Sequence, residues 1–364
     1  MDKAVKTPFY EKHLEHGAKI VPYAGFLMPI QYRGIMEEHR AVRNTVGVFD
    51  VSHMGEFIIK GPRAELFLNR VTINDVTALA VGQVQYSAMC YPDGGIVDDL
   101  LVYRFQDHYM MVVNAANIEK DYSWLQEHLE GDVELRNESS ETALLAVQGP
   151  DSFTVLQKLT EISLHNIPFY HFTTGKLAGK KMIISRTGYT GERGFELYHD
   201  PRDSRQLWDA VFEAGADFQI QPAGLGARDT LRMEMKYCLY GNDIDQTTHP
   251  LEAGLGWITK LDKGDFIGRE QLLASKAAGL KRRLVAFEMN DRGIPRPGYP
   301  VFSGSQEVGR VTSGTQSPSL NIGIGLGYVQ AEFSRVGTEL QVGIRGQKFA
   351  ATVIKPPFVE ARTT

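Results

Sequence analysis

The chain has 364 residues, of which 43% are hydrophobic and 23% charged, and its formal net charge is −5. This length exceeds what one hydrophobic core usually supports and predicts two or three domains. The charge balance argues against general nucleic-acid binding but leaves room for a local cationic pocket. Cys90 and Cys238 form no CxxC pair. This argues against a disulfide framework or structural zinc site and favours a reducing compartment.

No apolar run approaches the roughly 20 residues that a membrane-spanning helix needs. The N-terminal sequence Met1–Pro8 has neither the apolar core of a signal peptide nor the arginine-rich pattern of a transit peptide. We therefore expect a cytoplasmic protein, or one of a matrix-like compartment if a presequence has been removed.

Up to residue 240 the chain alternates between helical and strand-like patterns. Apolar residues at helical spacing predict helices at Gly34–Asn44, Pro62–Val71, Lys120–His128, Asp151–Leu159, Ser204–Ala214 and Ala227–Tyr240. Apolar runs between turn residues predict strands at Gly47–Lys60, Gln83–Tyr91, Asp99–Phe105, Tyr109–Asn114, Thr142–Gln148, Lys180–Ser185 and Phe195–Tyr198. This mixture indicates an α+β body, residues 1–279, with mainly antiparallel sheets and two subdomains.

The composition changes after Gly279, where short strands follow one another between glycine, proline and serine turns. The strands are expected at Lys281–Met289, Val308–Ser313, Gly325–Gln330, Glu339–Ile344 and Gln347–Ile354. No helix is expected between Arg283 and Pro356. Residues 280–364 are therefore predicted to form a separate all-β barrel or sandwich.

The segment Pro92–Arg104 joins a tight turn to a predicted strand. Its Asp-Gly-Gly sequence tolerates positive φ, and the apolar run from Leu100 to Tyr103 is typical of a buried strand. Because side chains alternate across a strand, Asp98 and Asp99 point to opposite faces. One acid then faces away from bulk water, where a carboxylate is costly unless it is paired or used. The spacing does not say whether this acid is Asp98 or Asp99. The alternative is that one of the two acids is exposed and the other caps the preceding turn.

A second candidate is the glycine-rich segment Arg186–Tyr198. Its three closely spaced glycines allow close approach to the backbone, and Tyr189 offers a flat face for stacking a heterocycle. Glu196 lies between two apolar residues, so in a strand it projects opposite to them. Its carboxylate can accept two hydrogen bonds from a pterin-like amidine edge. The alternative is a glycine-rich hairpin with a surface glutamate, and Glu192 is expected to be solvated.

The predicted helix Ala227–Tyr240 carries several charged residues. Asp229 and Arg232 are spaced to pair on one face. Arg228, near the helix start, can reach a carboxylate in a pocket by a bidentate contact. An ordinary structural ion pair is the alternative for this arginine.

Familiar cofactor and nucleophile motifs are missing. The sequence has no P-loop and no HExxH motif, and the glycines after Gly323 do not complete a dinucleotide fingerprint. Ser52 and His53 lack a nucleophile elbow, so a packing or pocket-wall role is favoured for His53. His13 and His16 are spaced for one helical face, and a solvated pair is favoured over a metal site. We expect neither a metal nor a nucleotide.

Taken together, the segments resemble the T-protein family of the glycine cleavage system, the aminomethyltransferases. The resemblance covers essentially the whole chain in order. The matching segments are Pro22–Phe26, Val48–Gly55, Tyr86, Gly94–Leu100, Val113–Ala115, Gln148–Pro150, Arg186–Glu192, Gly224–Leu231, Leu239–Gly241, Gly309–Gly314 and Lys355–Phe358.

The resemblance implies an activity and two partners. Family members take the aminomethyl group from the lipoyl arm of the H-protein, release ammonia and pass the methylene to tetrahydrofolate, giving 5,10-methylenetetrahydrofolate. The implied fold is a folate-holding α+β body with a C-terminal β-barrel around a central opening. Tetrahydrofolate is then the acceptor substrate, and no metal or nucleotide is required.

The matching motifs also imply roles for individual residues. Asp99 corresponds to the family's key acid, with Asp98 as its neighbour. Tyr189 and Glu196 correspond to contacts on the pterin side. The full set of implied folate or substrate contacts is Met54, Tyr86, Asn114, Tyr189, Glu196, Arg228, Tyr237 and Arg362. The sequence that flanks Tyr237 and Arg362 matches the family less specifically than that of the other residues.

Two other functions stay open at this point. One is a folate module that captures one-carbon units from methylated glycines, although such modules are usually fused to a flavin-binding oxidase. The other is a folate-binding protein without transferase activity that acts in RNA modification or iron–sulfur maintenance. Relatives of that kind tend to carry a reactive cysteine motif, which the surroundings of Cys90 and Cys238 do not resemble.

Overall fold

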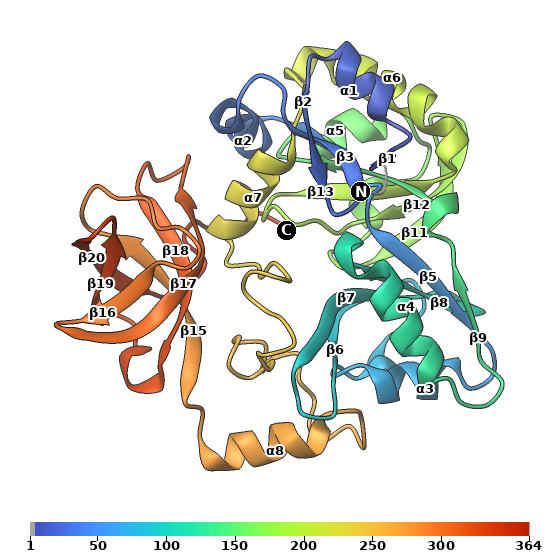
Figure 1. The fold of residues 1–364 in the computed structure, drawn as a ribbon. Helices are drawn as coiled ribbons and strands as arrows, with labels where there is room; N and C mark the ends of the chain where they lie inside the picture. The colour runs from blue at the N-terminus through green and yellow to red at the C-terminus, as the bar shows by residue number, and fades with distance from the viewer. Residues whose placement is uncertain (1–3, 364) are drawn as a thin grey trace.

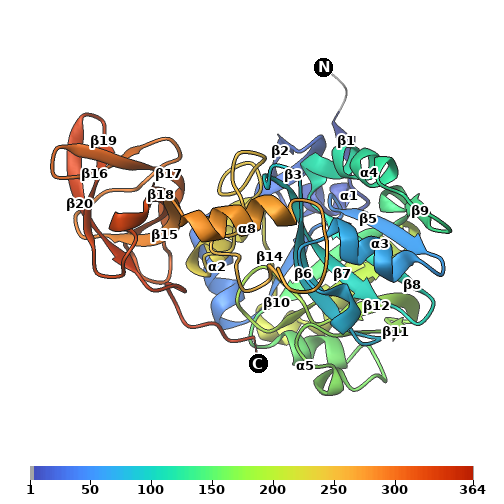
Figure 2. The same cartoon turned by 90° about the horizontal axis from the view of Figure 1, so that it is seen from below.

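A computed structural model describes residues 4–363 of the chain. Figure 1 shows a body of helices and sheets beside a β-barrel that is built from the last part of the chain. Helix α8 (Arg269–Ala278) lies on the connection between them, and Figure 2 shows it running from the barrel toward strand β6 (Val84–Cys90) of the body. The predicted α+β body with a C-terminal β-barrel is confirmed.

One sheet of the body has six strands in the order β11-β12-β13-β10-β4-β14. Their bounds are β4 (Gly47–Asp50), β10 (Ala143–Gln148), β11 (Phe172–Leu177), β12 (Lys180–Ser185), β13 (Gly194–His199) and β14 (Gln221–Pro222). Neighbours are antiparallel except β4 and β14. Helices α5 (Ser152–Gln157) and α6 (Ser204–Ala214) bury their apolar sides against one face, where Phe195 and Leu197 of β13 contact them. Alternation therefore turns Glu196 to the other face.

The second sheet has five strands in the order β6-β7-β8-β5-β9, all antiparallel. Besides β6, its strands are β5 (Gly55–Lys60), β7 (Ile96–Arg104), β8 (His108–Val113) and β9 (Glu134–Asn137). Helices α3 (Ala64–Val71) and α4 (Ile118–Glu127) cover one face of it. The other face packs on the six-stranded sheet, with Tyr103 and Met110 against Tyr198 and Ala146. Side chains from both sheets thus fill the space between them and form one shared layer of the core.

The N-terminal residues form a small sheet that the sequence patterns did not predict. It consists of β1 (Val5–Lys6), β2 (Lys19–Tyr23) and β3 (Phe26–Gln31), with helices α1 (Tyr10–Glu15) and α2 (Ile35–Asn44) beside it. The expectation that His13 is solvated is wrong. Its ring is fully buried, with 2.8 Å between Nε2 and Asp50 Oδ2 and 2.9 Å between Nδ1 and the Tyr32 hydroxyl. The reason is that α1 packs against Trp208 of α6.

Helix α7 (Leu225–Glu234) packs on α2 and β3 near the centre of the molecule. Gly224 permits this approach, because a Cβ atom there would lie 2.5 Å from the carbonyl carbon of Ile30. The prediction of a helix as far as Tyr240 is wrong. The chain turns out of the helix at Lys236, which adopts φ 58°. Residues 235–268 then run without a helix or strand to α8.

The barrel closes in the order β15-β18-β17-β16-β19-β20. Its strands are β15 (Arg282–Met289), β16 (Pro300–Ser303), β17 (Gln306–Gln316), β18 (Gly323–Gln330), β19 (Glu339–Ile344) and β20 (Gln347–Ile354). Its interior is apolar, with Phe287, Val311 and Val342 among the buried side chains. Of the described residues, no helix is long and apolar enough to cross a membrane.

The barrel is joined to the body by a common core and by one buried carboxylate. Leu284, Leu326 and Tyr328 of the barrel share an apolar cluster with Met233 and residues of the segment 235–268. Glu234, at the end of α7, accepts hydrogen bonds from Ser317 Oγ (2.6 Å) and Ser319 Oγ (2.9 Å) of the barrel and from Arg43 Nη2 of α2 (2.8 Å). The residues after β20 return to the body, where the Phe358 amide donates to the Glu234 carbonyl oxygen (2.8 Å).

Candidate active site

A cavity of about 980 Å³ opens where the two large sheets meet α7 and the segment 235–268. It is lined by eight of the predicted site residues: Met54, Tyr86, Asp99, Asn114, Tyr189, Glu196, Arg228 and Tyr237. Six of these come from positions scattered between residues 54 and 196, so the fold and not the local sequence brings them together. Arg362 is not among the lining residues.

Asp99 occupies the face of β7 that points between the sheets, as Leu101 and Tyr103 do. Its Oδ2 accepts a hydrogen bond from the Tyr86 hydroxyl (2.8 Å), and its Oδ1 accepts one from Asn114 Nδ2 (2.8 Å). Burial, followed by the charge of Asp98, raises the pKa of Asp99 to about 7 although both hydrogen bonds oppose the shift. The carboxyl group can therefore hold or release a proton near neutral pH.

Asp98 points to the opposite face, under α4, and is fully buried. Its Oδ1 accepts hydrogen bonds from the side chains of Asn114 (2.9 Å) and Asn117 (2.7 Å), and its Oδ2 accepts one from the Asn114 amide (3.0 Å). Burial and the nearby charge of Asp121 raise the pKa of Asp98. Strand alternation thus separates the two acids as predicted, and Asn114 bridges them.

Glu196 faces the cavity from β13 and is 8% exposed. Its Oε2 accepts a hydrogen bond from Thr187 Oγ1. Burial raises the pKa of Glu196, while the Thr187 hydrogen bond and the charge of Arg228 oppose the rise. The predicted direction of this side chain, opposite to Phe195 and Leu197, is confirmed.

Tyr189, Tyr237 and Arg228 form one aromatic and cationic wall. The rings of Tyr189 and Tyr237 are stacked with centroids 5.6 Å apart, and the Arg228 guanidinium carbon lies 4.7 Å from the Tyr189 centroid. The Tyr189 hydroxyl donates to the Cys238 carbonyl oxygen, which fixes the ring. Among residues 4–363, the Arg228 guanidinium has neither a hydrogen bond nor an ion pair. A cation with that freedom in a cavity can bind an anionic group of a ligand.

His53 lies in the wall beside Met54. Burial, together with the charge of Arg228, lowers the pKa of His53 to about 4, so its ring is neutral at physiological pH. Ser52 Oγ is directed to the Leu144 carbonyl oxygen (3.3 Å) and not to His53. The predicted pocket-wall position of His53 is therefore confirmed.

Arg362 and Glu192 pair with each other outside the cavity. Arg362 Nη2 lies 2.6 Å from Glu192 Oε1, and Arg43 Nη1 lies 3.0 Å from the same oxygen. The expectation of a solvated Glu192 is wrong, since its side chain is enclosed by these two arginines and the residue is 3% exposed. Arg362 thereby ties the chain after the barrel to the body.

The sequence reasoning did not single out several residues that line the cavity. Thr187 belongs to a quoted motif, but nothing in its spacing marked it as the partner of Glu196. Trp257 is 65% exposed and lies against Tyr86, with ring centroids 6.0 Å apart. It belongs to the irregular segment 235–268, where no periodicity tells which side chains face inward.

Comparisons with known proteins show which family the chain resembles along its length. Residues 9–263 match the model of the GCVT N-terminal domain, and residues 282–360 match that of the Glycine cleavage T-protein C-terminal barrel domain. The chain is 57% identical over 356 residues to the aminomethyltransferase of Bacteroides fragilis and 52% identical over 355 residues to that of Halothermothrix orenii. Each alignment covers 97% of this chain and 99% of the relative.

A solved structure agrees with the sequence relatives. The glycine cleavage system aminomethyltransferase T from Bartonella henselae matches with a TM-score of 0.92 at 33% identity, covering 99% of both chains. The family models, the relatives and this structure all span both the body and the barrel. The chain therefore belongs to the glycine cleavage T-protein family of aminomethyltransferases.

Proposed function

We propose that the chain transfers the methylene of the aminomethyl group carried on the lipoyl arm of the H-protein to tetrahydrofolate, with release of ammonia. The observation that carries this proposal is Asp99, a cavity carboxyl with a pKa of about 7. Tyr86 and Asn114 hold both of its oxygens in place. The relatives named aminomethyltransferase support the reaction type.

The residues of the cavity suit a reduced folate. Glu196 presents a carboxyl group to the amidine edge of a pterin, and Thr187 keeps it oriented. Arg228, with no anionic partner among the described side chains, suits the carboxylate end of the ligand. Aromatic side chains of the same cavity, such as Tyr189 and Tyr237, supply apolar contact for the flat part of the molecule. Bound tetrahydrofolate supplies two nitrogens, N5 and N10, that take up the methylene.

In this proposal Asp99 acts by position and charge. Its carboxylate orients N5, keeps it in the nucleophilic form and stabilises the positive charge that develops during transfer. Tyr86 and Asn114 prevent the carboxylate from turning away. Asp98 holds Asn114 from behind and thus positions Asp99 without facing the cavity.

The test is the substitution Asp99→Asn, which keeps the shape of the side chain and removes its charge. We expect tetrahydrofolate binding, measured by calorimetry, to remain within a few fold, and methylene transfer from aminomethyl-loaded H-protein to fall by about 10²–10⁴-fold. Asp107→Asn, on the exposed turn between β7 and β8, is the matched control and should keep full activity. Wild-type transfer by the Asp99 variant would falsify the assigned role.

The non-catalytic folate-binding function makes a different prediction. It requires folate binding with no folate-dependent ammonia release from aminomethyl-loaded H-protein. The full-length similarity to aminomethyltransferases favours the transferase.

The division into a body of residues 1–279 and a barrel of residues 280–364 is likewise our proposal.

A further inference from the structure

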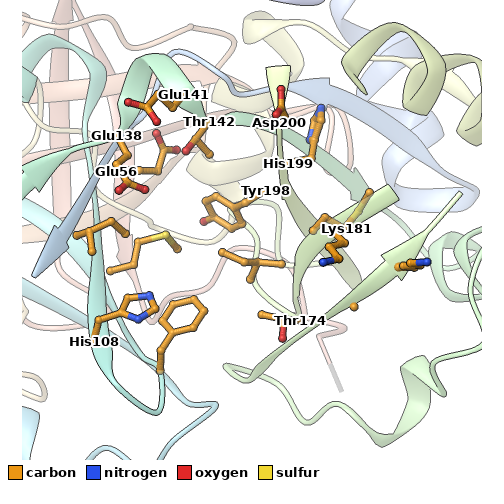
Figure 3. A pocket seen from close by; sticks show the side chains of 17 residues that line it. Glu56, His108, Glu138, Glu141, Thr142, Thr174, Lys181, Tyr198, His199 and Asp200 are labelled. Carbon is orange, nitrogen blue, oxygen red and sulfur yellow. The ribbon is translucent and has the colours of Figure 1, made fainter. Parts of the chain in front are cut away.

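A second cavity, of about 650 Å³, lies between the same two sheets. Figure 3 shows it from close by, with Tyr198 near its middle. Tyr198 lines both this cavity and the candidate active site. Its hydroxyl lies 2.9 Å from that of Tyr103, and the Tyr198 side chain stands at the boundary between the two cavities. Exposed residues such as Lys176 and Glu141 line the second cavity, which therefore reaches solvent.

Three strands pass directly from one cavity to the other. On each, residues two apart share a face and line first the active site and then the second cavity. These sets are Met54, Glu56 and Ile58 on and just before β5, Val112, Met110 and His108 on β8, and Glu196, Tyr198 and Asp200 on and just after β13. The second cavity is therefore the continuation of the active-site gap behind Tyr198.

Glu56 stands in this continuation without a partner. The residue is 1% exposed, and neither carboxyl oxygen has a hydrogen bond among residues 4–363. Burial, together with the charge of Glu196, raises the pKa of Glu56 well above its usual value. A buried carboxyl group without a partner is costly, which points to a polar species that it receives there.

Further acids lead from Glu56 toward solvent. Figure 3 shows Glu138 and Glu141 on the same side of Tyr198 as Glu56, whereas Lys181 lies on the other side. The Glu138 amide donates to the Glu56 carbonyl oxygen (2.9 Å), so β9 and the turn after it hold these acids close to Glu56. Glu138 already pairs with Arg136 (3.3 Å), so Glu56 and Glu141 are the acids on this side that suit a small cation.

We propose that the second cavity is the exit for ammonium, and that Glu56 is the group that receives it from the active site. This inference rests on the proposed function, in which ammonia leaves while folate and the lipoyl arm occupy the main cavity. Ammonia is the smallest of the products, so it is the one that we assign to this route beside Tyr198. The acids near the mouth then attract the cation toward solvent.

The step at Glu56 is a single proton transfer. The neutral carboxylic acid donates its proton to ammonia, leaving a carboxylate and an ammonium ion as an ion pair. No electron is transferred, and no other bond forms or breaks. When ammonium leaves, a proton from solvent restores the carboxylic acid.

The kinetic test runs the reaction in reverse, from 5,10-methylenetetrahydrofolate, reduced lipoyl H-protein and ammonium chloride. Glu56→Gln should raise the KM for ammonium by about tenfold, because an amide cannot form the ion pair. The KM for the folate and kcat at saturating ammonium should stay within about twofold of wild type. Glu134→Gln on β9, exposed and outside the cavity, is the matched control. An unchanged KM for ammonium in an active Glu56 variant overturns the proposal.

A binding test is independent of activity. Crystals soaked in thallium(I) acetate, whose cation is close to ammonium in size, should show anomalous density beside Glu56 in wild type and none there in Glu56→Gln. Absent density in wild type, or density retained in the variant, overturns the exit. If wild type makes no aminomethyl H-protein in the reverse assay although thallium binds at Glu56, the proposed function fails and the cation site stands.

Discussion

Asp99 combines deep placement in a cavity with a position next to a second carboxyl group. Both features favour its neutral form, while Tyr86 and Asn114 favour the charged form, and the resulting pKa is about 7. The group therefore changes charge near neutral pH. Replacing any one of these neighbours is expected to shift that balance and not merely to loosen the site.

This balance predicts a pH dependence of transfer. If the carboxylate is the active form, kcat/KM rises with pH through an apparent pKa of about 7 and levels off above it. The rise should be absent in Asp99→Asn and present in the Asp107→Asn control. A variant at position 99 that keeps the same rise would assign the titration to another group.

The same shift affects stability with a definite sign. A raised pKa means that the folded state holds the proton more tightly than the unfolded state. The stabilisation from Asp99 is therefore fully present below pH 3.8 and is lost as the pH rises through about 7. In urea unfolding, the difference in the free energy of unfolding between wild type and Asp99→Asn should fall as the pH rises from 3.8 to about 7. A difference that increases over this pH range contradicts a raised pKa for Asp99.

At the scale of residues, the sequence predicts a side chain's direction better than its partners. The apolar neighbours of Glu196 fix the face to which it points, because alternation is a local property of a strand. Glu192, four residues earlier, finds partners 149 and 170 positions away along the chain, Arg43 and Arg362. A local sequence pattern carries no information about partners so far away along the chain, so the burial of Glu192 could not be predicted.

At the scale of elements, α7 depends on a close approach that only glycine permits. Gly224→Ala would place a methyl group 2.5 Å from the Ile30 carbonyl carbon. We expect a loss of about 1–3 kcal/mol in the free energy of unfolding, measured in urea, since such overpacking forces the backbone to shift. Gly256→Ala is the control, because its nearest neighbour would lie 3.7 Å away and its φ is not positive. Equal effects of the two changes would show that the approach is not limiting.

Which elements could be predicted follows from their burial. Most helices of the body that carry an apolar stripe lie within a few residues of their predicted bounds. The predicted strand Gly47–Lys60 is wrong, because the chain turns after Asp50 and divides it into β4 and β5 of two different sheets. Helix α8 buries a single residue, Leu272, so its periodic signal is weak. Strand β16 is four residues long and begins with Pro300, which does not favour a strand. Both therefore depend on tertiary packing.

At the scale of the whole molecule, Glu234 connects α7, α2 and the barrel through one carboxylate. Although burial opposes it, the hydrogen bond and charge of His39, followed by the hydrogen bond from Ser317 and the charge of Arg43, lower the pKa of Glu234 to about 2. The stabilisation is thus present above the usual value of 4.5 and is lost as the pH falls from there toward about 2.

Removing this charge should loosen the attachment of the barrel. Glu234→Gln is expected to cost about 3–5 kcal/mol at pH 7, since it leaves Arg43 buried with a weaker partner. The deficit, measured by urea unfolding, should shrink as the pH falls below 4.5. Glu307→Gln, which breaks an exposed pair with Arg310 on the barrel, is the control and should cost less than about 1 kcal/mol. A deficit that does not depend on pH would point to packing instead of charge.

The apolar cluster shared by the barrel and the segment 235–268 has a consequence for how members of this family can exchange parts. Leu284, Leu326 and Tyr328 fit side chains such as Met233 and Ile258 that lie outside the barrel. A chimera that grafts only residues 280–364 from a relative would join two surfaces that were never selected together. We expect such grafts to be more stable when residues 233–268 are transplanted with the barrel, so that recombination is limited by the cluster and not by the linker.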